Sequence, residues 1–226
     1  MAKSKIIKAL ANNEISMEIA LNRLLIIASD LDNDNLADWA AAELHGYSKD
    51  MELPEYRKKK SLHFTYSGIN GHFQITHSPF PYVEIIAEHD ENAFDVPIMD
   101  SVSTLQTFID NYETQSYCRD YTYLNGYVYE RTGIQCTSIM QRIPLNFLQN
   151  ILSEIKTRLL RILIKLDKEY GCLDDLDVDT STKSPEEVAA INKVVNNYIY
   201  INNCVNIGDK NKIEGSEILG GGKRNG

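Results

Sequence analysis

One long apolar seam in the second half of the sequence constrains the fold most. Apolar residues recur there at spacings of 4, 3, 4, 3 and 4, and they are Leu148, Leu152, Ile155, Leu159, Ile162 and Leu166. This spacing predicts a helix that begins at Pro144 and ends at Gly171, with one face buried over about three heptads. Neighbouring apolar residues widen the seam and favour a core helix packed within the chain, with an intermolecular coiled coil as the alternative.

Shorter helices are predicted before this seam. Residues 16–31 and residues 36–46 each carry an apolar stripe at helical spacing, and a polar break at residues 32–35 separates them. Two helices joined so tightly are expected to pack as an antiparallel hairpin. Ser16 is expected to cap the first helix, and Gly46 is expected to end the second in the left-handed conformation. A further short helix is expected over residues 3–11.

The middle of the chain changes to the period of a β-strand. Alternation over residues 62–66, a glycine turn at 68–71 and apolar residues at 73 and 75 predict a hairpin, and residues 134–143 predict a further strand. Residues 82–87 are expected to form another strand, and Asn125-Gly126 is expected to be the turn of a second hairpin. Residues 101–112 are expected to be helical. The fold class is therefore α+β, with an N-terminal helical hairpin, a mixed or antiparallel sheet, a long closing helix and a short C-terminal β-type tail.

The charge balance excludes some partners. The chain has 23 Lys and Arg against 32 Asp and Glu, a net charge of −9, which argues against a nucleic-acid partner because phosphate binding needs a basic surface. No apolar run is long enough to predict a membrane span, and no secretory signal is expected. Four cysteines without a CxxC pair are typical of a reducing compartment, so we expect the protein to be cytoplasmic.

The sequence predicts no catalytic residue, no metal site and no cofactor. It has no phosphate-binding glycine loop, no nucleophile elbow and no HExxH motif. An enzyme, such as a toxin nuclease or hydrolase, is kept as an alternative on a single group of residues, namely His63, His72, His77, Glu84 and Glu88. The basic run at residues 57–60 is interpreted as a solvated edge.

The last quarter of the chain is divided by composition. Residues 172–183 form an acidic linker, and Ser184 and Glu187 predict a capping box for a short helix over 184–195, with Pro185 at its first position. The predicted organisation is an α+β domain over 1–171, the linker, this helix, an Asn/Ile/Gly-rich self-association motif over 196–219 and a disordered end over 220–226.

The segment after residue 195 alternates β-branched residues with Asn and Gly. Copies stacked in register would form asparagine ladders and dry apolar faces, as in cross-β assemblies. Its centre resembles the RIP homotypic interaction motif at Val205, Asn206, Ile207, Gly208, Asn211 and Ile213, with Asn206 where Gln is usual. This resemblance implies functional amyloid, self-association and recruitment of a partner that bears a similar motif. A closed β-element that trimerises or docks on the domain, and a disordered tail, remain alternatives.

The body of the chain carries a second resemblance. Several residues occur in the order found at the start of the AbiTii domain, and they are Trp39, Glu43, Gly46, Tyr47, Pro54, Tyr56 and Arg57. Residues 155–160 and 166–169 are similar to its closing helix. The resemblance implies antiphage defence by abortive infection and carries over no catalytic residue. The residues themselves predict structural roles, with the aromatic side chains in the core and Glu43 or Glu55 paired with Arg57. The resulting hypothesis is a non-catalytic sensor or adaptor that oligomerises, with a purely structural homo-oligomer as the alternative.

Overall fold

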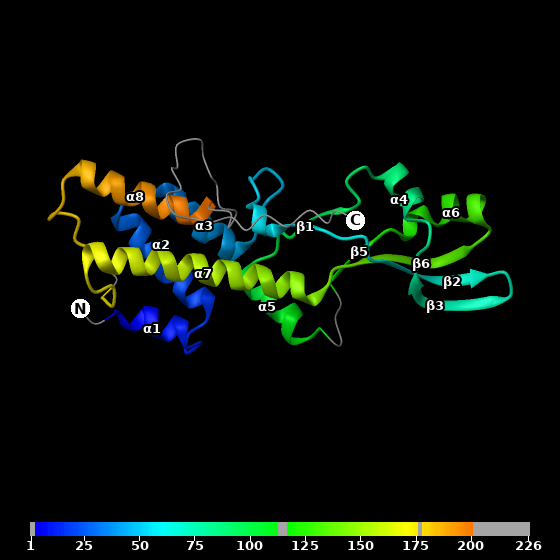
Figure 1. Cartoon of the computed structure of the whole chain (residues 1–226), viewed down its shortest axis with the longest axis horizontal. Helices are drawn as coiled ribbons and strands as arrows, with labels where there is room; N and C mark the ends of the chain where they lie inside the picture. Colours follow the sequence, from blue (N-terminus) through cyan, green and yellow to red (C-terminus); the bar gives the residue numbers. More distant parts are fainter. Residues whose placement is uncertain (1–2, 113–116, 176–177, 201–226) are drawn as a thin grey trace, which may run out of the picture.

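The computed structural model describes residues 3–112, 117–175 and 178–200. A bundle of helices lies at one end of an elongated molecule, and a four-stranded sheet with two short helices lies at the other (Figure 1). The α+β fold class is confirmed. The helices are α1 (Lys5–Ala11), α2 (Met17–Asp30), α3 (Asp34–His45), α4 (Val83–His89), α5 (Val102–Asp110), α6 (Asn125–Thr132), α7 (Leu145–Tyr170) and α8 (Pro185–Tyr200), with 3-10 turns η1 (Glu55–Arg57) and η2 (Thr122–Leu124).

The long helix α7 is the centre of the bundle. The six seam residues are at most 7 % exposed, and α7 packs against α1, α2, α5 and α8 of the same chain. The core-helix interpretation is therefore confirmed, because the seam is already covered within one copy. Pro144 precedes the helix in extended conformation, and Gly171 ends it with a φ of 88°.

Local capping chemistry sets several helix ends. The Ser16 side chain accepts a hydrogen bond from the Ile19 amide at 3.2 Å, and the Ser184–Glu187 capping box is formed in both directions. Gly46 has φ 88° and ψ 168°, so it has the positive φ expected but lies outside the left-handed helical region.

The helix α8 is longer than the sequence analysis predicts. It continues from residue 195 to Tyr200, so residues 196–200, assigned above to the β-type tail, are helical. The physical reason is an apolar stripe that continues at helical spacing, since Ile191, Val195 and Ile199 are all buried.

The sheet is antiparallel throughout. Its order is β3-β2-β6-β5, formed by β2 (Phe64–Asn70), β3 (Phe73–Pro79), β6 (Gln135–Arg142) and β5 (Cys118–Asp120), while β1 (Lys58–Lys60) pairs with β4 (Asp95–Pro97). The predicted β2–β3 hairpin is confirmed, with Asn70 opposite Phe73.

Two predicted β-elements are wrong. The predicted strand at 82–87 is the helix α4, and Asn125-Gly126 begins the helix α6 instead of forming a hairpin turn. Ile85 and Ile86 are both buried although they are adjacent, and Leu124 and Val128 are buried four residues apart. Both patterns fit one face of a helix on the sheet, so packing against the sheet overrides the local turn signal.

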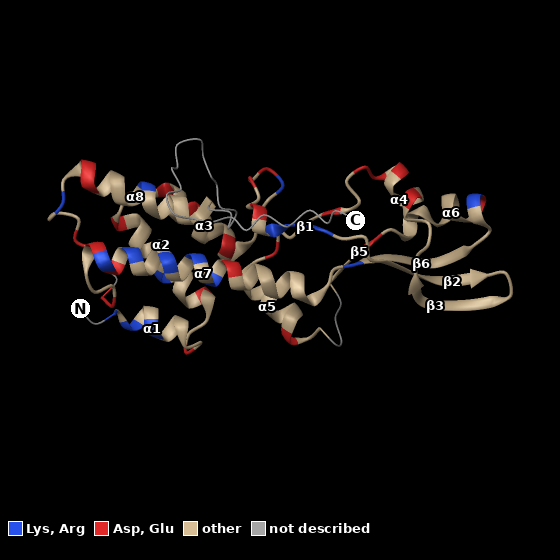
Figure 2. Cartoon of the chain, viewed as in Figure 1, with Lys and Arg blue, Asp and Glu red and all other residues tan. Residues whose placement is uncertain are grey.

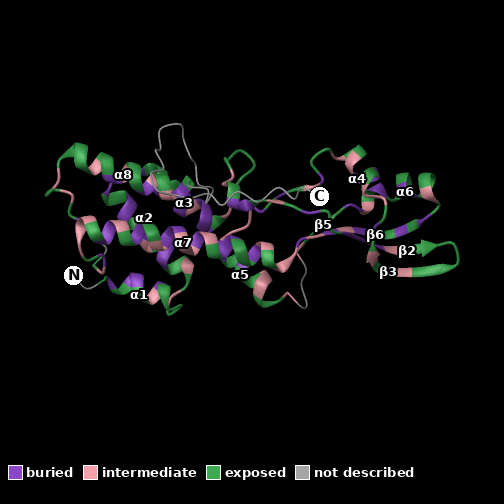
Figure 3. Ribbon diagram, in the orientation of Figure 1, coloured by how far each residue is buried: buried purple, intermediate pink, exposed green. Residues whose placement is uncertain are grey.

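Two hydrophobic cores result. One lies inside the helical bundle, and the other lies between the sheet and the two short helices α4 and α6. Figure 3 shows buried residues following α7 and β6, whereas β3 is largely exposed. Among the described residues, no helix has both the length and the apolar character to cross a membrane.

Candidate functional site

The residues of the AbiTii-like motif meet in a buried polar network at the centre of the molecule. Glu43 lies near the end of α3 and Arg57 lies in η1, and both are 0 % exposed. The Arg57 Nη2 forms an ion pair with the Glu43 Oε2, and the Arg57 Nε donates to the Glu43 Oε1 at 3.2 Å. The predicted pairing of Arg57 is confirmed with Glu43, whereas Glu55 pairs with Lys58 at the surface.

Two tyrosines complete the surroundings of the carboxylate. The hydroxyls of Tyr47 and Tyr56 donate to the Glu43 Oε1 at 2.7 and 2.5 Å, and the Trp39 Nε1 donates to the Tyr56 hydroxyl at 2.9 Å. Burial, and next to it the Glu43 charge, raises the pKa of both tyrosines well above the ordinary value. Both phenols therefore stay neutral donors over the physiological range.

The guanidinium of Arg57 joins the bundle to the connection between β4 and α5. Its Nη1 donates to the carbonyl oxygens of Ile98 and Asp100 at 2.9 and 2.7 Å. Burial alone would lower the pKa of Arg57, but the Glu43 charge, the hydrogen bond to Glu43 and the two tyrosines together more than offset it, and the pKa is raised. The prediction that residues 57–60 form a solvated edge is therefore wrong for Arg57, because its charge is neutralised inside the protein.

The glycine of the motif allows a close approach to the same connection. The Tyr47 amide donates to the Met99 carbonyl at 2.7 Å, and a Cβ added to Gly46 would lie 2.8 Å from that carbonyl oxygen. The positive φ and this contact explain why glycine suits the position. Beyond the connection, the Tyr117 hydroxyl donates to the Asp100 Oδ2 at 2.5 Å.

An arginine of α7 extends the network, and the sequence analysis missed it. The Arg158 guanidinium lies 4.6 Å from the centre of the Tyr56 ring, and its Nη1 donates to the carbonyls of Tyr198 and Ile199 at 3.0 and 3.1 Å. It thus binds the last turn of α8, where a positive charge is favourable. The signal was present in the sequence, since position 158 lies on the apolar face of the seam, next to Leu159.

The chemistry of this network is structural. The Glu43 carboxylate accepts hydrogen bonds from three side chains, and Arg57 is satisfied by that carboxylate and by two carbonyls. A general acid or base needs a proton that can be exchanged with a substrate, and here the ionised groups face each other. The network therefore holds three segments together.

The residues that supported the enzyme alternative are not gathered into a site. His63 precedes β2 and His72 lies in the turn at its other end, so a seven-residue strand separates the two. Glu88 pairs with Arg131 of α6 at the surface. In the part of the chain that the structure describes, no group of three His, Cys, Asp or Glu residues is arranged to hold a metal ion.

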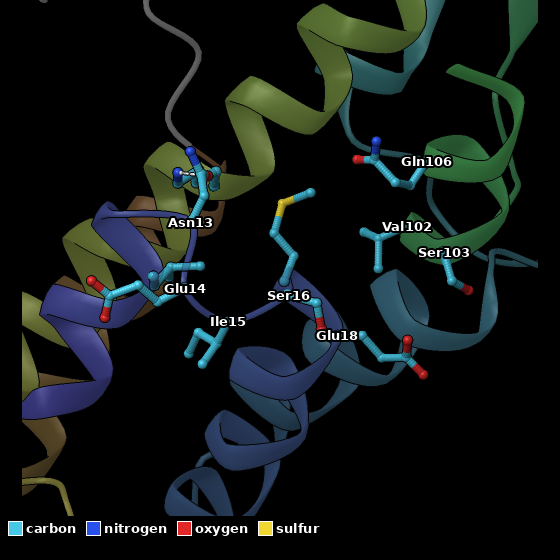
Figure 4. Close-up of a pocket in the computed structure, with 11 residues that line it drawn as sticks. Asn13, Glu14, Ile15, Ser16, Glu18, Val102, Ser103 and Gln106 are labelled. Carbon is cyan, nitrogen blue, oxygen red and sulfur yellow. Dashed lines mark hydrogen bonds between the residues drawn. The ribbon is translucent and has the colours of Figure 1, made fainter. Parts of the chain in front are cut away.

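Cavities open on the bundle. One, of about 480 Å³, lies between the α1–α2 connection, α5 and α7; Figure 4 shows Asn13, Glu14 and Ile15 on one side and Val102, Ser103 and Gln106 on the other. Another, of about 310 Å³, lies against the network and is lined by residues that include Trp39, Tyr47, Pro54, Ile199 and Tyr200. All seven residues of the motif are therefore part of the network or of its immediate walls.

The predicted self-association residues lie elsewhere in the sequence. Val205, Asn206, Ile207, Gly208, Asn211 and Ile213 are all outside the described residues.

Comparison with known proteins gives one match. The AbiTii family matches residues 4–193, which is well over half of the chain and includes the network and most of α8. No curated protein and no solved structure gives a significant match. The chain therefore belongs to the AbiTii family.

Proposed function

We propose that this chain is a non-catalytic sensor or adaptor of abortive-infection defence that relays a signal by self-association of its C-terminal segment. Membership of the AbiTii family implies the defence role. The role as a sensor or adaptor rests on two features of the chain. One is a buried network whose polar groups are hydrogen-bonded to one another, and the other is a segment that resembles a self-association motif. The partner would be a second copy, or a defence protein that bears a similar motif.

The contact of Arg158 with the end of α8 is the observation that carries this proposal. The segment after Tyr200 begins where the carbonyls of Tyr198 and Ile199 are held by an arginine of the central helix. That arginine stacks on Tyr56, which in turn donates to Glu43. A body that fixes the starting point of the segment suits an adaptor, because the segment is then presented from a defined position.

The amino acids of the segment support self-association. Residues 201–213 contain four asparagines, and the β-branched residues Ile201, Val205, Ile207 and Ile213 lie among them. In stacked copies the amides would form ladders and the apolar side chains would interdigitate, so the free energy of assembly would come from backbone pairing and dry packing.

Alanine substitution of Val205, Asn206, Ile207 and Gly208 tests the proposal. We expect the variant to lose the large species in sedimentation velocity, to keep the circular dichroism of the folded body and to lose protection against phage in cells. A control replaces Lys223, Arg224 and Asn225, which follow the segment, by alanine, and this variant is expected to assemble normally. Large species that persist in the first variant would overturn the proposal, and a finite mass independent of concentration would favour the closed oligomer.

A further inference from the structure

Three neighbouring strands of the sheet, β3, β2 and most of β6, lack charged side chains. Residues 61–83 contain no Lys, Arg, Asp or Glu, although these residues make up 24 % of the whole chain. Strand β6 adds none before Arg142, at its last position. In Figure 2 the strands β2 and β3 and most of β6 are tan, whereas the blue of Lys and Arg and the red of Asp and Glu are spread over the helical bundle.

The outer strand of this uncharged region is an open edge. Strand β3 is the last in the sheet order, and β2 is its strand neighbour among the described residues. Alternate residues of an edge strand direct both the amide and the carbonyl group away from the sheet, where they can pair with another strand. Two apolar side chains are exposed here, Phe73 of β3 at 74 % and Ile69 of β2 at 47 %, and the exposed residues Gln74 and Thr76 of β3 are polar and uncharged.

We propose that β3 is an association edge for a second copy of this chain, paired antiparallel about a twofold axis. Each copy carries a net charge of −9, so two copies repel each other except where their contact is free of charge. The β3 edge provides that contact, and identical antiparallel edges are self-complementary under twofold symmetry. The edge also lacks the lysines with which many proteins block such pairing.

The geometry of the two sheet edges limits the assembly to a dimer. Pro79 ends β3, and His77 has a φ of 48° beside an irregularity in the β2–β3 register, so the regular part of the edge is short. At the other edge, β5 has three residues and includes Arg119 and Asp120, so a charged, short edge opposes further growth. The dimer contact is separate from the C-terminal segment and goes beyond the proposed function.

A charge-exchange experiment tests this edge. With the twofold axis at Ile75, Gln74 of one copy faces Thr76 of the other, and both side chains are exposed. The variant Gln74→Lys with Thr76→Lys places like charges opposite each other, and the variant Gln74→Glu with Thr76→Glu does the same with the other sign. Mixing the two variants brings lysine opposite glutamate across the contact.

The measurements are made on the full chain in which Val205, Asn206, Ile207 and Gly208 are alanine, so that association by the C-terminal segment is removed. Sedimentation velocity from about 1 µM to about 200 µM is expected to show a dimer for this parent chain. For each charged variant we expect the dissociation constant of the dimer to be at least about ten times larger. The mixture is expected to recover the dimer. A matched control, Asn22→Lys with Ser29→Lys on the exposed face of α2, adds the same charge elsewhere and is expected to dimerise as the parent does.

Three results would overturn the proposal. A parent chain that stays monomeric over the whole range has no such contact, whether or not the C-terminal segment assembles. Equal dimerisation of parent and charged variants, with unchanged thermal unfolding, would place the contact elsewhere. Hydrogen exchange of the β3 amides gives the third test: we expect protection to rise with concentration, whereas strong protection at every concentration would mean that the chain covers its own edge.

Discussion

Removal of the Glu43 carboxylate is expected to destabilise the folded chain severely. In Glu43→Ala the Arg57 guanidinium stays buried without its counter-charge, which costs about 3–5 kcal/mol. The hydroxyls of Tyr47 and Tyr56 lose their acceptor as well, at roughly 1 kcal/mol each. The sum of about 5–7 kcal/mol is a large share of the net stability of a typical domain, which is about 5–15 kcal/mol.

Glu55→Ala is the matched control for this prediction. Glu55 lies two residues before Arg57 in the same turn, and it also pairs with a basic side chain, that of Lys58. Here the two side chains are 58 % and 47 % exposed, so solvent screens their attraction and the loss is expected to be about 0–1 kcal/mol. Each of the two substitutions thus removes a carboxylate that pairs with a basic side chain, and the two carboxylates differ in burial.

Denaturant unfolding of the full chain, followed by circular dichroism, measures both losses. We expect the midpoint for Glu43→Ala to fall sharply with an unchanged slope, and the midpoint for Glu55→Ala to stay close to that of the parent. If Glu43→Ala fails to fold, Glu43→Gln preserves the side-chain shape and is expected to cost roughly 2–4 kcal/mol.

The double variant Glu43→Leu with Arg57→Met isolates the role of the unpaired charge. It is expected to be more stable than Glu43→Leu alone, because no charge remains buried, although the carbonyls of Ile98 and Asp100 lose their donor. Equal losses for Glu43→Ala and Glu55→Ala, or a double variant that is additive, would refute the reasoning.

Three further predictions follow from the described contacts. Gly171→Ala, at φ 88° in open space, is expected to cost about 1–3 kcal/mol in denaturant unfolding. Gly46→Ala has the same φ, and because its Cβ also meets a carbonyl oxygen its loss is expected to be larger by at least about 1 kcal/mol; equal losses would contradict this. Burial raises the pKa of Asp167, but hydrogen bonds from Ser4 and Lys3 more than offset it and lower that pKa. Asp167→Asn is therefore expected to cost about 1–2 kcal/mol at neutral pH, and the difference should shrink as pH falls below about 4. The pKa values of Tyr47 and Tyr56 are raised in the folded chain. Above about pH 10 the unfolded chain loses these two protons while the folded chain keeps them. The free energy of unfolding should therefore fall as pH rises beyond that value. Absorbance titration of the folded chain should show delayed ionisation of these two phenols. Tyr47→Phe and Tyr56→Phe should each reduce the delayed fraction, part of which remains because burial also raises the pKa of Tyr117 and Tyr121.

The helical part of the fold could be predicted from the sequence because its signals are local. The α7 seam repeats over three heptads, and capping serines lie directly before α2 and α8. Each signal depends on residues within four positions of one another, so no knowledge of distant contacts is needed.

The short helices α4 and α6 could not be predicted in this way. Their seven and eight residues are too few for periodicity to separate a helix from a strand, and Asn125-Gly126 carries a strong turn signal of its own. What decides their conformation is burial against the sheet, which depends on strands that lie as far away in the sequence as β2.

The candidate site, too, could be predicted from the sequence only in part. The partners Glu43 and Arg57 could be proposed because they frame one recognisable stretch of sequence, but the burial of Arg57 depends on carbonyls more than 40 residues away. The place of Arg158 on the apolar face of α7 could be predicted from the sequence, whereas its acceptors lie on a different helix and could not. Charged residues are poor indicators of exposure where distant carbonyls can satisfy them.

The network gains its importance from the division of the body into two cores. The chain passes between the helical core and the sheet core at residues 57–63, 95, 118–120 and 140–142. Buried polar side chains form hydrogen bonds to the backbone at or beside these crossings in two places. Gln141 donates to the carbonyls of Ser61 and Ala93 at 2.8 and 2.7 Å, and Arg57 binds the connection that follows β4.

A displacement of the sheet relative to the bundle would therefore have to break hydrogen bonds to buried groups, each at a cost of about 1–3 kcal/mol. The same Arg57 network reaches Tyr56 and Arg158, and through Arg158 the last turn of α8. The strands β2, β3 and β6 and the position at which the C-terminal segment begins are thus connected by contiguous contacts. Such contacts can carry a signal only if they have two arrangements, so the decisive observation is whether pairing at β3 changes the hydrogen exchange of the final turn of α8.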